Sequence, residues 1–251
     1  MLPTPDTSHV PYTHVYEPAE DSFLLLDTLS SETETSFLRS RFPASSHTPP
    51  LILEVGPGSG VVIAFITANS ASLLGHPATL SLAVDLNRFA CAATGTTARK
   101  AAAEGEGGGG LFLDAVQGDL ASPLRPGQVD VLVFNPPYVP TDGLPASAPT
   151  TPRQAGEGDK PSFEEESRLL ELAYAGGKDG MEITDRLLDA LPDTLSQRGV
   201  AYVLLCAGNG PEEVKERIRG WKGRWRAETV GTSGRTAGWE RLQIVRIWRG
   251  E

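Results

Sequence analysis

The sequence predicts an α/β fold: a mostly parallel sheet with helices on both faces and an antiparallel addition at its C-terminal end. Short apolar runs bounded by turn residues alternate with longer segments of helical spacing, which is typical of repeated strand–helix–strand units. A polar or glycine-rich segment follows each of the first four strand candidates. A chain of 251 residues with 39% hydrophobic residues is long enough to bury such a core without disulfide or metal support.

The expected elements alternate along most of the chain. The first is a helix at 18–29, because an acidic first turn precedes apolar residues at helical spacing. Strands are expected at 51–55, 79–84, 111–116, 129–134, 199–206, 225–230 and 242–248. Further helices are expected at 61–68, 88–103, 163–174, 181–191 and 212–219. The last two strands, joined by a Gly-rich connection, form the hairpin-like antiparallel addition.

One domain is expected to hold nearly all of these elements. Residues 1–15 are rich in Pro, Thr and Ser without periodicity and are expected to form a flexible N-terminal arm. Residues 16–251 then form a single domain with loop insertions near 104–110 and 139–162. The first insertion is glycine-rich, and the second is a long Pro-, Ala-, Thr- and Gly-rich loop that could act as a lid or be disordered.

Composition narrows the partners and the compartment. With 32 acidic against 22 basic residues the formal charge is -10, which makes a nucleic-acid partner unlikely. The longest apolar runs are too short to span a membrane, and the N-terminus lacks the blocks of a secretory signal. Two cysteines far apart in sequence favour a reducing setting, so we expect a cytoplasmic and possibly also nuclear protein. The four histidines lack ligand spacing, so no metal is expected.

A glycine-rich loop follows the first strand candidate. Glu54 and Val55 lead into it, and its glycines are Gly56, Gly58 and Gly60. Such a loop allows a tight turn and close approach of the backbone to a ligand, while the next helix offers free N–H groups. The dinucleotide fingerprint requires a glycine where this chain has Val61, so the spacing disfavours hydride chemistry on a nicotinamide.

Acidic residues follow the second and third strand candidates. A carboxylate can accept hydrogen bonds from both hydroxyls of a ribose, which is the role expected of Asp85. Asp119 is placed to accept from an adenine amino group, with the backbone N–H and apolar side chain of Leu120 beside it. Taken singly, each acid could be an ordinary solvated strand end; together with the glycine loop they indicate one binding site.

The tetrapeptide after the fourth strand candidate is the strongest signal. It consists of Asn135, Pro136, Pro137 and Tyr138. Because proline donates no N–H, the carbonyls of Asn135 and Pro136 are free to accept from a ligand, as is the Asn135 side-chain oxygen. Tyr138 adds an aromatic wall. The tetrapeptide therefore predicts an acceptor-rich clamp for a planar NH₂ group such as an amide or a nucleobase amine; a Pro-rich turn is the alternative.

Together these motifs resemble those of class I S-adenosylmethionine-dependent methyltransferases that methylate amino groups. Within that class, the opening segment 15–23 and the segments 53–62, 131–139 and 175–180 resemble the eukaryotic HemK-like release-factor glutamine methyltransferases. The resemblance covers roughly residues 14–206 and implies a Rossmann-like seven-stranded sheet with S-adenosyl-L-methionine as methyl donor and S-adenosyl-L-homocysteine as product. The implied reaction is methylation of the glutamine side-chain amide nitrogen in the Gly-Gly-Gln motif of a translation termination factor.

The resemblance also implies roles and a partner. The positions that match cofactor contacts are Ser22, Glu54, Gly56, Asp85, Asp119, Leu120 and Asn135, together with the loop glycines Gly58 and Gly60. The tetrapeptide 135–138 matches the substrate clamp. Family enzymes pair with a small zinc-binding activator protein, and the candidate edge strand 111–116 is a possible surface for that heterodimer.

Three other functions stay open at the level of sequence. The same clamp fits an exocyclic amine of adenine in DNA or RNA, although the acidic charge opposes it. A protein lysine would need to lose a proton before it could act as a nucleophile. A noncatalytic cofactor-binding subunit of a complex is an alternative of a different class, which turnover of the cofactor would exclude.

Overall fold

Seven strands pair into one sheet in the computed structural model, which describes residues 2–76, 78–104, 109–145, 161–234 and 241–250. The strands are β1 (Leu51–Val55), β2 (Leu80–Asp85), β3 (Leu111–Gln117), β4 (Val129–Phe134), β5 (Leu195–Cys206), β6 (Trp225–Thr232) and β7 (Leu242–Arg249). Their order is β3-β2-β1-β4-β5-β7-β6. The first five strands pair in parallel, and β7 runs antiparallel to both β5 and β6. The mostly parallel sheet with its antiparallel C-terminal addition is confirmed.

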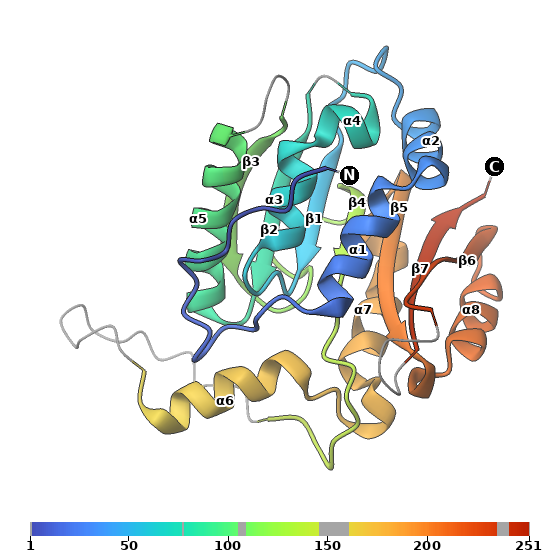
Figure 1. Cartoon of the computed structure of the whole chain (residues 1–251). Helices are drawn as coiled ribbons and strands as arrows, with labels where there is room; N and C mark the ends of the chain where they lie inside the picture. The colour runs from blue at the N-terminus through green and yellow to red at the C-terminus, as the bar shows by residue number, and fades with distance from the viewer. Residues whose placement is uncertain (1, 77, 105–108, 146–160, 235–240, 251) are drawn as a thin grey trace.

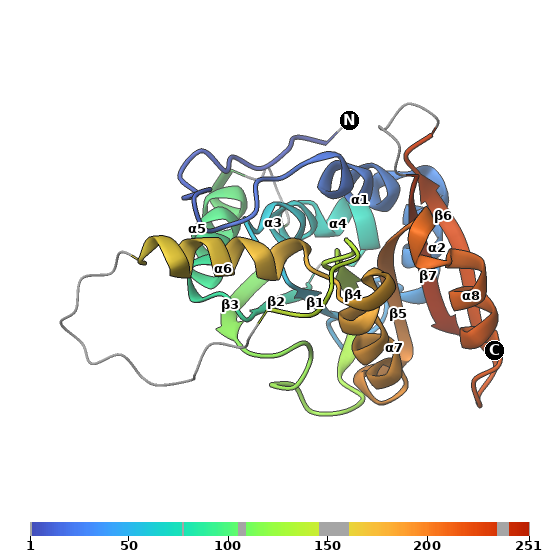
Figure 2. The ribbon, with the colours of Figure 1, turned by 90° about the horizontal axis from the view of Figure 1, so that it is seen from below.

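Helices cover both faces of this sheet (Figures 1 and 2). They are α1 (Glu20–Ser30), α2 (Glu32–Arg41), α3 (Val61–Ala68), α4 (Ser70–Leu74), α5 (Arg88–Glu104), α6 (Phe163–Tyr174), α7 (Glu182–Thr194) and α8 (Pro211–Arg219), with short 3₁₀ turns η1 (Lys178–Gly180) and η2 (Ala207–Asn209). Apolar side chains of α1 to α4 pack with one face of the sheet, and those of α7 and α8 pack with the other. Side chains that alternate between the two faces of the strands therefore contribute to two apolar layers, one on each side of the sheet.

Helix α2 was not predicted from the apolar pattern. Only Glu34 and Leu38 of its residues are buried, so it presents almost no apolar stripe. Its start is nevertheless encoded, because the side chain of Ser31 accepts a hydrogen bond from the Glu34 N–H in the manner of an N-cap. The five-residue α4 was missed as well, since it follows α3 after a single residue and adds no period of its own.

Strand β5 begins at residue 195, four residues before its predicted start at Gly199. The reason is tertiary: the side chains of Ser196 and Arg198 both donate to the buried carboxylate of Asp130 on β4. These contacts hold the first residues of β5 in extended conformation beside β4, where Val129 pairs with Leu195.

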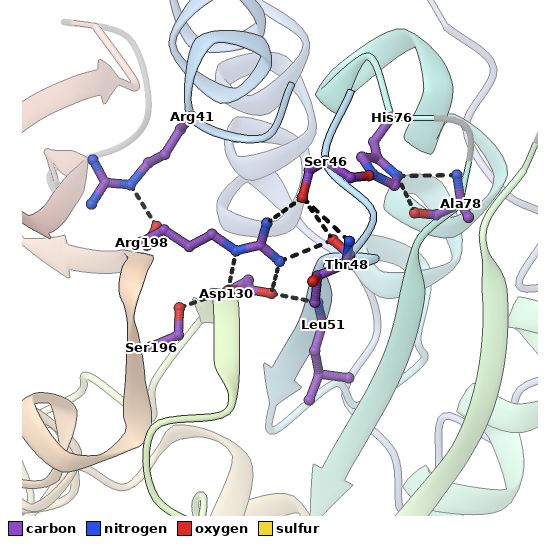
Figure 3. Close-up of polar contacts among 9 residues, drawn as sticks. All are labelled: Arg41, Ser46, Thr48, Leu51, His76, Ala78, Asp130, Ser196 and Arg198. Atoms are coloured by element: carbon purple, nitrogen blue, oxygen red, sulfur yellow. Dashed lines mark hydrogen bonds and ion pairs between the residues drawn. The ribbon is translucent and has the colours of Figure 1, made fainter. Parts of the chain in front are cut away.

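The same carboxylate ties together the amino ends of the central strands (Figure 3). Asp130 also accepts from the backbone N–H of Leu51, at 3.0 Å. Arg198 donates onward to Ser46 Oγ at 3.3 Å and to the Thr48 carbonyl at 3.1 Å, which fixes the segment that leads into β1. This network lies at the amino ends of β1 and β4. Ligands of open α/β sheets bind at the carboxyl ends of the strands, so the network has a structural role and lies at the opposite end of the sheet from the candidate site.

The segment before α1 contains no helix or strand within residues 2–19. It runs along α5, where Val10 and Val15 are buried against Ala90 and Ala93. The carbonyl of His14 accepts from the Asn87 side chain at 2.7 Å. The flexibility of residues 1–15 stays a prediction; the structure adds the contacts that hold the arm beside the carboxyl ends of the strands.

The predicted insertions fall largely outside the described residues, at 105–108 and 146–160. Their described flanks are anchored to neighbouring elements. The N–H of Gly110 donates to the Thr67 carbonyl at 2.7 Å, and Val139 forms a single parallel bridge with Ala175. Helix α6 follows the second insertion and lies across the carboxyl ends of the strands (Figures 1 and 2).

Candidate active site

A pocket of about 310 Å³ opens at the carboxyl ends of the parallel strands. Strand β1 lies between β2 and β4, so the chain leaves the sheet in opposite directions on the two sides of this point, which is where α/β proteins bind ligands. The predicted site residues that line the pocket are Ser22, Glu54, Gly56, Gly58, Asp85, Asp119, Leu120, Asn135, Pro136, Pro137 and Tyr138. The structure therefore brings together residues that span more than a hundred positions of sequence.

The glycine loop forms the floor between β1 and α3. The N–H of Gly56 donates to the Val84 carbonyl at 2.8 Å, and the N–H of Gly58 donates to Asp85 at 3.3 Å. Gly60 is the one predicted cofactor-binding residue that does not line the pocket. It has φ +79°, and an added Cβ would lie 2.6 Å from the Thr94 Cα, so the structure gives this glycine a packing role between α3 and α5.

Glu54 lies at the inner end of the pocket and is almost fully buried. Its Oε2 accepts from the N–H of Ile63 at 2.7 Å, which satisfies one of the free donors of the first turn of α3. Burial raises the pKa of Glu54 to about 8, and the nearby charge of Asp85 acts in the same direction. In the ligand-free pocket this carboxyl is therefore poised to change its charge near neutral pH.

Asp85 ends β2 at the pocket wall. Burial raises its pKa to about 6, although hydrogen bonds from the N–H groups of Asn87 and Gly58 act in the opposite direction. The Asn87 N–H donates to Oδ1 at 2.7 Å. A carboxylate held by two backbone donors has its remaining lone pairs directed by a rigid loop, which suits a diol that must be recognised in one orientation.

Asp119 and Leu120 form the wall beyond β3. Leu120 adopts a left-handed backbone conformation with φ +52°, which is uncommon for a residue with a side chain. Arg186 of α7 donates to Asp119 Oδ2 at 2.5 Å and also lines the pocket. Sequence reasoning missed Arg186, because nothing in its own segment indicates that α7 reaches this loop.

The N-terminal segment closes another side of the pocket through Tyr16, Asp21 and Ser22. The Tyr16 hydroxyl donates to Asp21 Oδ2 at 3.0 Å. Asp21 Oδ1 accepts from the Ser22 N–H at 2.6 Å and from the Ser22 hydroxyl at 3.2 Å. Ser22 was predicted, whereas Tyr16 and Asp21 were not assigned roles. Their position in the segment 15–23, which carried the resemblance, was the available signal.

The clamp leaves β4 with its key acceptor free. Asn135 Oδ1 is buried and has no hydrogen-bond partner in the structure, although Asn135 lines the pocket. A buried polar atom without a partner is costly unless a ligand satisfies it. Asn135 Oδ1 therefore marks the point in the pocket where a donor group is expected.

Helix α6 and the turn after it form the outer wall. Leu169, Leu172 and Tyr174 of α6 line the pocket together with Leu144 and Ile183. Sequence reasoning placed this helix correctly but did not predict its part in the site. The lining of the pocket therefore combines apolar side chains with the carboxyl groups.

The donor and acceptor set fits a cationic nucleoside. Asp21, Glu54 and Asp85 are carboxyl groups that line the pocket, and their ionised forms favour a positive charge in the ligand; Asp85 stands where a ribose diol would be held. The described residues contain no group of three or more His, Cys, Asp or Glu that could hold a metal ion. The strand order, the glycine loop and the Asn-Pro-Pro-Tyr clamp identify the protein as a class I S-adenosylmethionine-dependent methyltransferase.

Comparison with known proteins specifies the family. The chain is 37% identical over 254 residues to Methyltransferase HEMK2 of Mus musculus, covering 98% of this chain and 96% of that protein. It is 35% identical over 256 residues to the eRF1 methyltransferase catalytic subunit mtq2 of Schizosaccharomyces pombe, covering 99% and 96% respectively. No family model matches. The chain belongs to the eukaryotic HemK-like family of methyltransferases, which includes HEMK2 and mtq2.

The name of a more distant relative states which side chain that protein is thought to methylate. The putative protein N5-glutamine methyltransferase MJ0928 of Methanocaldococcus jannaschii is 28% identical over 239 residues, covering 94% of this chain and 92% of that protein.

Among the described helices, none is long and apolar enough to cross a membrane.

Proposed function

We propose that this protein transfers a methyl group from S-adenosylmethionine to the side-chain amide nitrogen of the glutamine in the Gly-Gly-Gln motif of a translation termination factor. The observation that carries the proposal is Asn135 Oδ1, a buried acceptor without a partner at the pocket wall. The names of relatives support the substrate, since mtq2 is called an eRF1 methyltransferase and a bacterial relative is called a release factor glutamine methyltransferase.

The clamp has to solve a problem of reactivity. An amide nitrogen is a poor nucleophile, because its lone pair is delocalised into the carbonyl. The substrate NH₂ group can donate one hydrogen bond to Asn135 Oδ1 and the other to the Pro136 carbonyl. Two acceptors fix the plane of the amide and turn the nitrogen toward the methyl group, so the clamp contributes chiefly by orientation.

Charge supplies the second contribution. Bound S-adenosylmethionine supplies an activated methyl group on a positively charged sulfur. As the nitrogen forms its bond to the methyl carbon, the bond from that carbon to sulfur would break with its electron pair passing to sulfur, and S-adenosyl-L-homocysteine would leave. Positive charge then builds up on nitrogen beside Asn135 Oδ1 and the Pro136 carbonyl. These acceptors are fixed before the reaction, so they stabilise that charge without reorganising. The nitrogen then loses a proton to water, since an N-protonated amide is a strong acid, and the product is the neutral N-methyl amide.

The apolar wall completes the site. Leu169, Leu172 and Tyr174 line the pocket, and their apolar surface offers water little to bind once ligands fill the site. In a dry pocket the acceptors of the clamp act at lower effective dielectric, which strengthens their interaction with a developing positive charge. The wall thus increases the effect of Asn135 without touching the reacting atoms.

The test is methyl transfer from labelled S-adenosylmethionine to the termination factor, beside a variant factor in which the loop glutamine is replaced by alanine. We expect label only on the factor that has the glutamine, with N-methylglutamine identified by mass spectrometry. Equal labelling of both factors would contradict the glutamine assignment. Labelling of DNA, RNA or lysine instead, under the same conditions, would move the substrate to one of the alternative amines.

We further propose that a small zinc-binding activator protein binds the free edge of β3. This strand pairs only with β2 and ends the sheet, so one row of its backbone N–H and C=O groups is unpaired with another strand of the described chain. Leu111 is 61% exposed and Leu113 is 48% exposed on this strand. The words "catalytic subunit" in the name of mtq2 support a heterodimer.

The partner is tested by co-purification of the two proteins. Leu113→Glu places a charge on the proposed apolar edge and is expected to abolish the complex. Lys222→Glu, a change in charge on the exposed turn after α8, is the control and should leave the complex intact. Retention of a stable complex by Leu113→Glu would overturn the proposed surface.

We also propose a cytoplasmic location, with a nuclear fraction in addition. The cytoplasm is where translation takes place, so the enzyme would encounter a termination factor there. Fractionation of cells that express a tagged full-length chain tests it. Recovery of the chain only from a secretory compartment would contradict the proposal.

A further inference from the structure

Asn209 lies next to the clamp without belonging to the pocket wall. It ends the 3₁₀ turn η2, directly after the carboxyl end of β5, and only 5% of its surface is exposed. Its Oδ1 accepts from the backbone N–H of Cys206 at 2.8 Å. This bond holds the asparagine side chain at the carboxyl end of β5. Strand β5 lies next to β4, and the clamp directly follows β4.

The amide nitrogen of the same side chain joins two other segments. Asn209 Nδ2 donates to the Tyr138 carbonyl at 3.2 Å and to the Asp179 carbonyl at 3.1 Å. Tyr138 is the last residue of the clamp, and Asp179 lies in η1, in the turn between α6 and α7. The three side-chain hydrogen bonds of Asn209 to described residues thus connect the ends of β4 and β5 with this turn.

The turn itself is packed against the clamp backbone. A Cβ added at Gly176 would lie 2.4 Å from the Pro137 carbonyl oxygen, and one added at Gly180 would lie 2.0 Å from the Tyr138 carbonyl oxygen. Neither position can accept a side chain without moving the clamp. The glycines therefore allow an approach that Asn209 then fixes by hydrogen bonding.

The backbone of the turn carries one strained residue and is held to the clamp by further hydrogen bonds. Asp179 has φ +56°, a left-handed conformation that is strained for an aspartate and that turns its carbonyl to Asn209. The Val139 N–H donates to the Tyr174 carbonyl at 3.0 Å, and the Gly176 N–H donates to the Val139 carbonyl at 2.8 Å. The backbone on both sides of the turn is thus attached to the residue that follows the clamp.

We infer that Asn209 is a positioning residue for methyl transfer, which fixes the direction of the clamp carbonyls by holding the Tyr138 carbonyl against the turn 176–180. The inference rests on the proposed function of the clamp. Asn209 does not line the pocket, so it acts through the clamp and leaves the binding of S-adenosylmethionine to other residues. Loss of its two donated bonds lets the clamp backbone vary in direction, which lowers the rate of transfer more than it lowers any affinity.

The test uses two variants of Asn209. Asn209→Asp keeps the size and the acceptor for the Cys206 N–H, but its second carboxylate oxygen faces two carbonyl oxygens and cannot donate. Asn209→Ala removes all three bonds. For both variants we expect kcat to fall about tenfold or more, while the dissociation constant of S-adenosylmethionine, measured by calorimetry, stays within about twofold of wild type.

Asn69→Ala is the matched control. Asn69 is a partly buried asparagine whose Nδ2 donates to the Phe65 carbonyl at 2.9 Å at the C-terminal end of α3, away from the clamp. This variant should leave both kcat and cofactor affinity unchanged. If it lowered kcat as much as Asn209→Asp, loss of any such hydrogen bond would account for the result and the inference would fail.

Hydrogen exchange gives a readout that does not need substrate. In Asn209→Asp, the amides of Val139, Thr141 and Gly176 should exchange faster, with unchanged exchange in β1 and β2. Unchanged exchange at these amides, or full kcat in Asn209→Asp, would overturn the inference. If the wild-type protein binds cofactor but does not methylate the termination factor, the proposed function fails, and the exchange experiment still decides whether Asn209 positions the clamp.

Discussion

The carboxylate of Asp85 accepts a hydrogen bond from the backbone N–H of Gly58 at 3.3 Å. This contact joins the end of β2 to the glycine loop after β1, so the acid and the loop form one unit of the pocket wall. It also explains why the two motifs occur together: the loop needs an acceptor at this point, and the carboxylate needs donors that hold it toward a ligand.

The first prediction is that S-adenosylmethionine binds more tightly as the pH rises through about 6. Burial raises the pKa of Asp85 to about 6 and that of Glu54 to about 8, so both carboxyls bind protons in the free pocket at pH 5. A diol and a cation favour the ionised carboxylates, hence binding must release protons. Calorimetry at pH 5 to 8, in buffers of different ionisation enthalpy, measures the affinity and the number of protons released.

The free protein should show the opposite dependence. Because burial raises the pKa of Asp85 in the folded state above its ordinary value of 3.8, its contribution to stability is present below that value and is lost as pH rises through about 6. Asp85→Asn should remove this part of the pH dependence and weaken cofactor binding at least tenfold. Asp114→Asn, an acid on β3 that does not line the pocket, is the control. Equal affinity of Asp85→Asn and wild type at pH 8 would remove the ribose role.

The second prediction is that Asn135→Ala abolishes methyl transfer, with a loss of at least about a hundredfold in kcat, while the fold and cofactor binding remain. Asn135 Oδ1 has no partner among the described residues, so its removal breaks no hydrogen bond there and the free energy of unfolding should change little. Single-turnover assays and urea titrations measure the two quantities. Asn135→Asp keeps acceptor oxygens and should retain more activity than Asn135→Ala; near-normal kcat in the alanine variant would show that the clamp is assigned wrongly.

The third prediction concerns Arg186, which the structure adds to the site. Arg186→Ala should weaken the binding of S-adenosylmethionine several-fold, because Asp119 loses the side chain that holds it at the pocket rim. The ion pair is about half exposed, so its loss should change the free energy of unfolding by less than about 1 kcal/mol. Arg217→Ala is a close control, since Arg217 pairs with Asp185 at 2.6 Å at similar exposure but does not line the pocket. Equal cofactor affinities for both variants would contradict the role of Arg186.

Whether a site residue could be predicted from the sequence depends on the kind of element that brings it to the pocket. Asp85 ends β2, Asp119 lies two residues beyond the end of β3, and Asn135 directly follows β4. Because the carboxyl ends of parallel strands meet at one edge of a sheet, their positions could be predicted from sequence. Arg186 and Leu169 reach the pocket from helices. Which helix crosses which strand end is set by tertiary packing, and no local pattern records it.

The same limit applies to residues that support the site. The bonds of Asn209 span 71 residues to Tyr138 and 30 residues to Asp179, and both go to backbone carbonyls. A contact with a backbone carbonyl places no requirement on the identity of the residue that bears it, so its sequence carries no sign of the partner. Gly180 lies in the segment 175–180 that carried the resemblance, but the close approach of the Tyr138 carbonyl, which requires a glycine there, appears only in the structure.

The last prediction concerns a buried ion pair that no sequence pattern indicated. Glu34 is fully buried in α2 and accepts from Arg246 Nη1 at 2.8 Å and from the Tyr202 hydroxyl at 2.8 Å. Arg246 lies over the Phe37 ring at 3.8 Å, which adds a cation–π contact. Glu34→Ala leaves Arg246 Nη1 and the buried Tyr202 hydroxyl without the acceptor that they share, and should lower the free energy of unfolding by about 3 to 5 kcal/mol in urea titration.

Glu228→Ala provides the matched comparison, because Glu228 pairs with the same arginine at 3.2 Å but is half exposed. Its loss should cost less than about 1 kcal/mol, since water replaces it. The difference between the two variants measures burial, because both remove one carboxylate from Arg246. Equal costs would mean that water reaches Arg246 from the side of α2, and the predicted dependence on burial would be wrong.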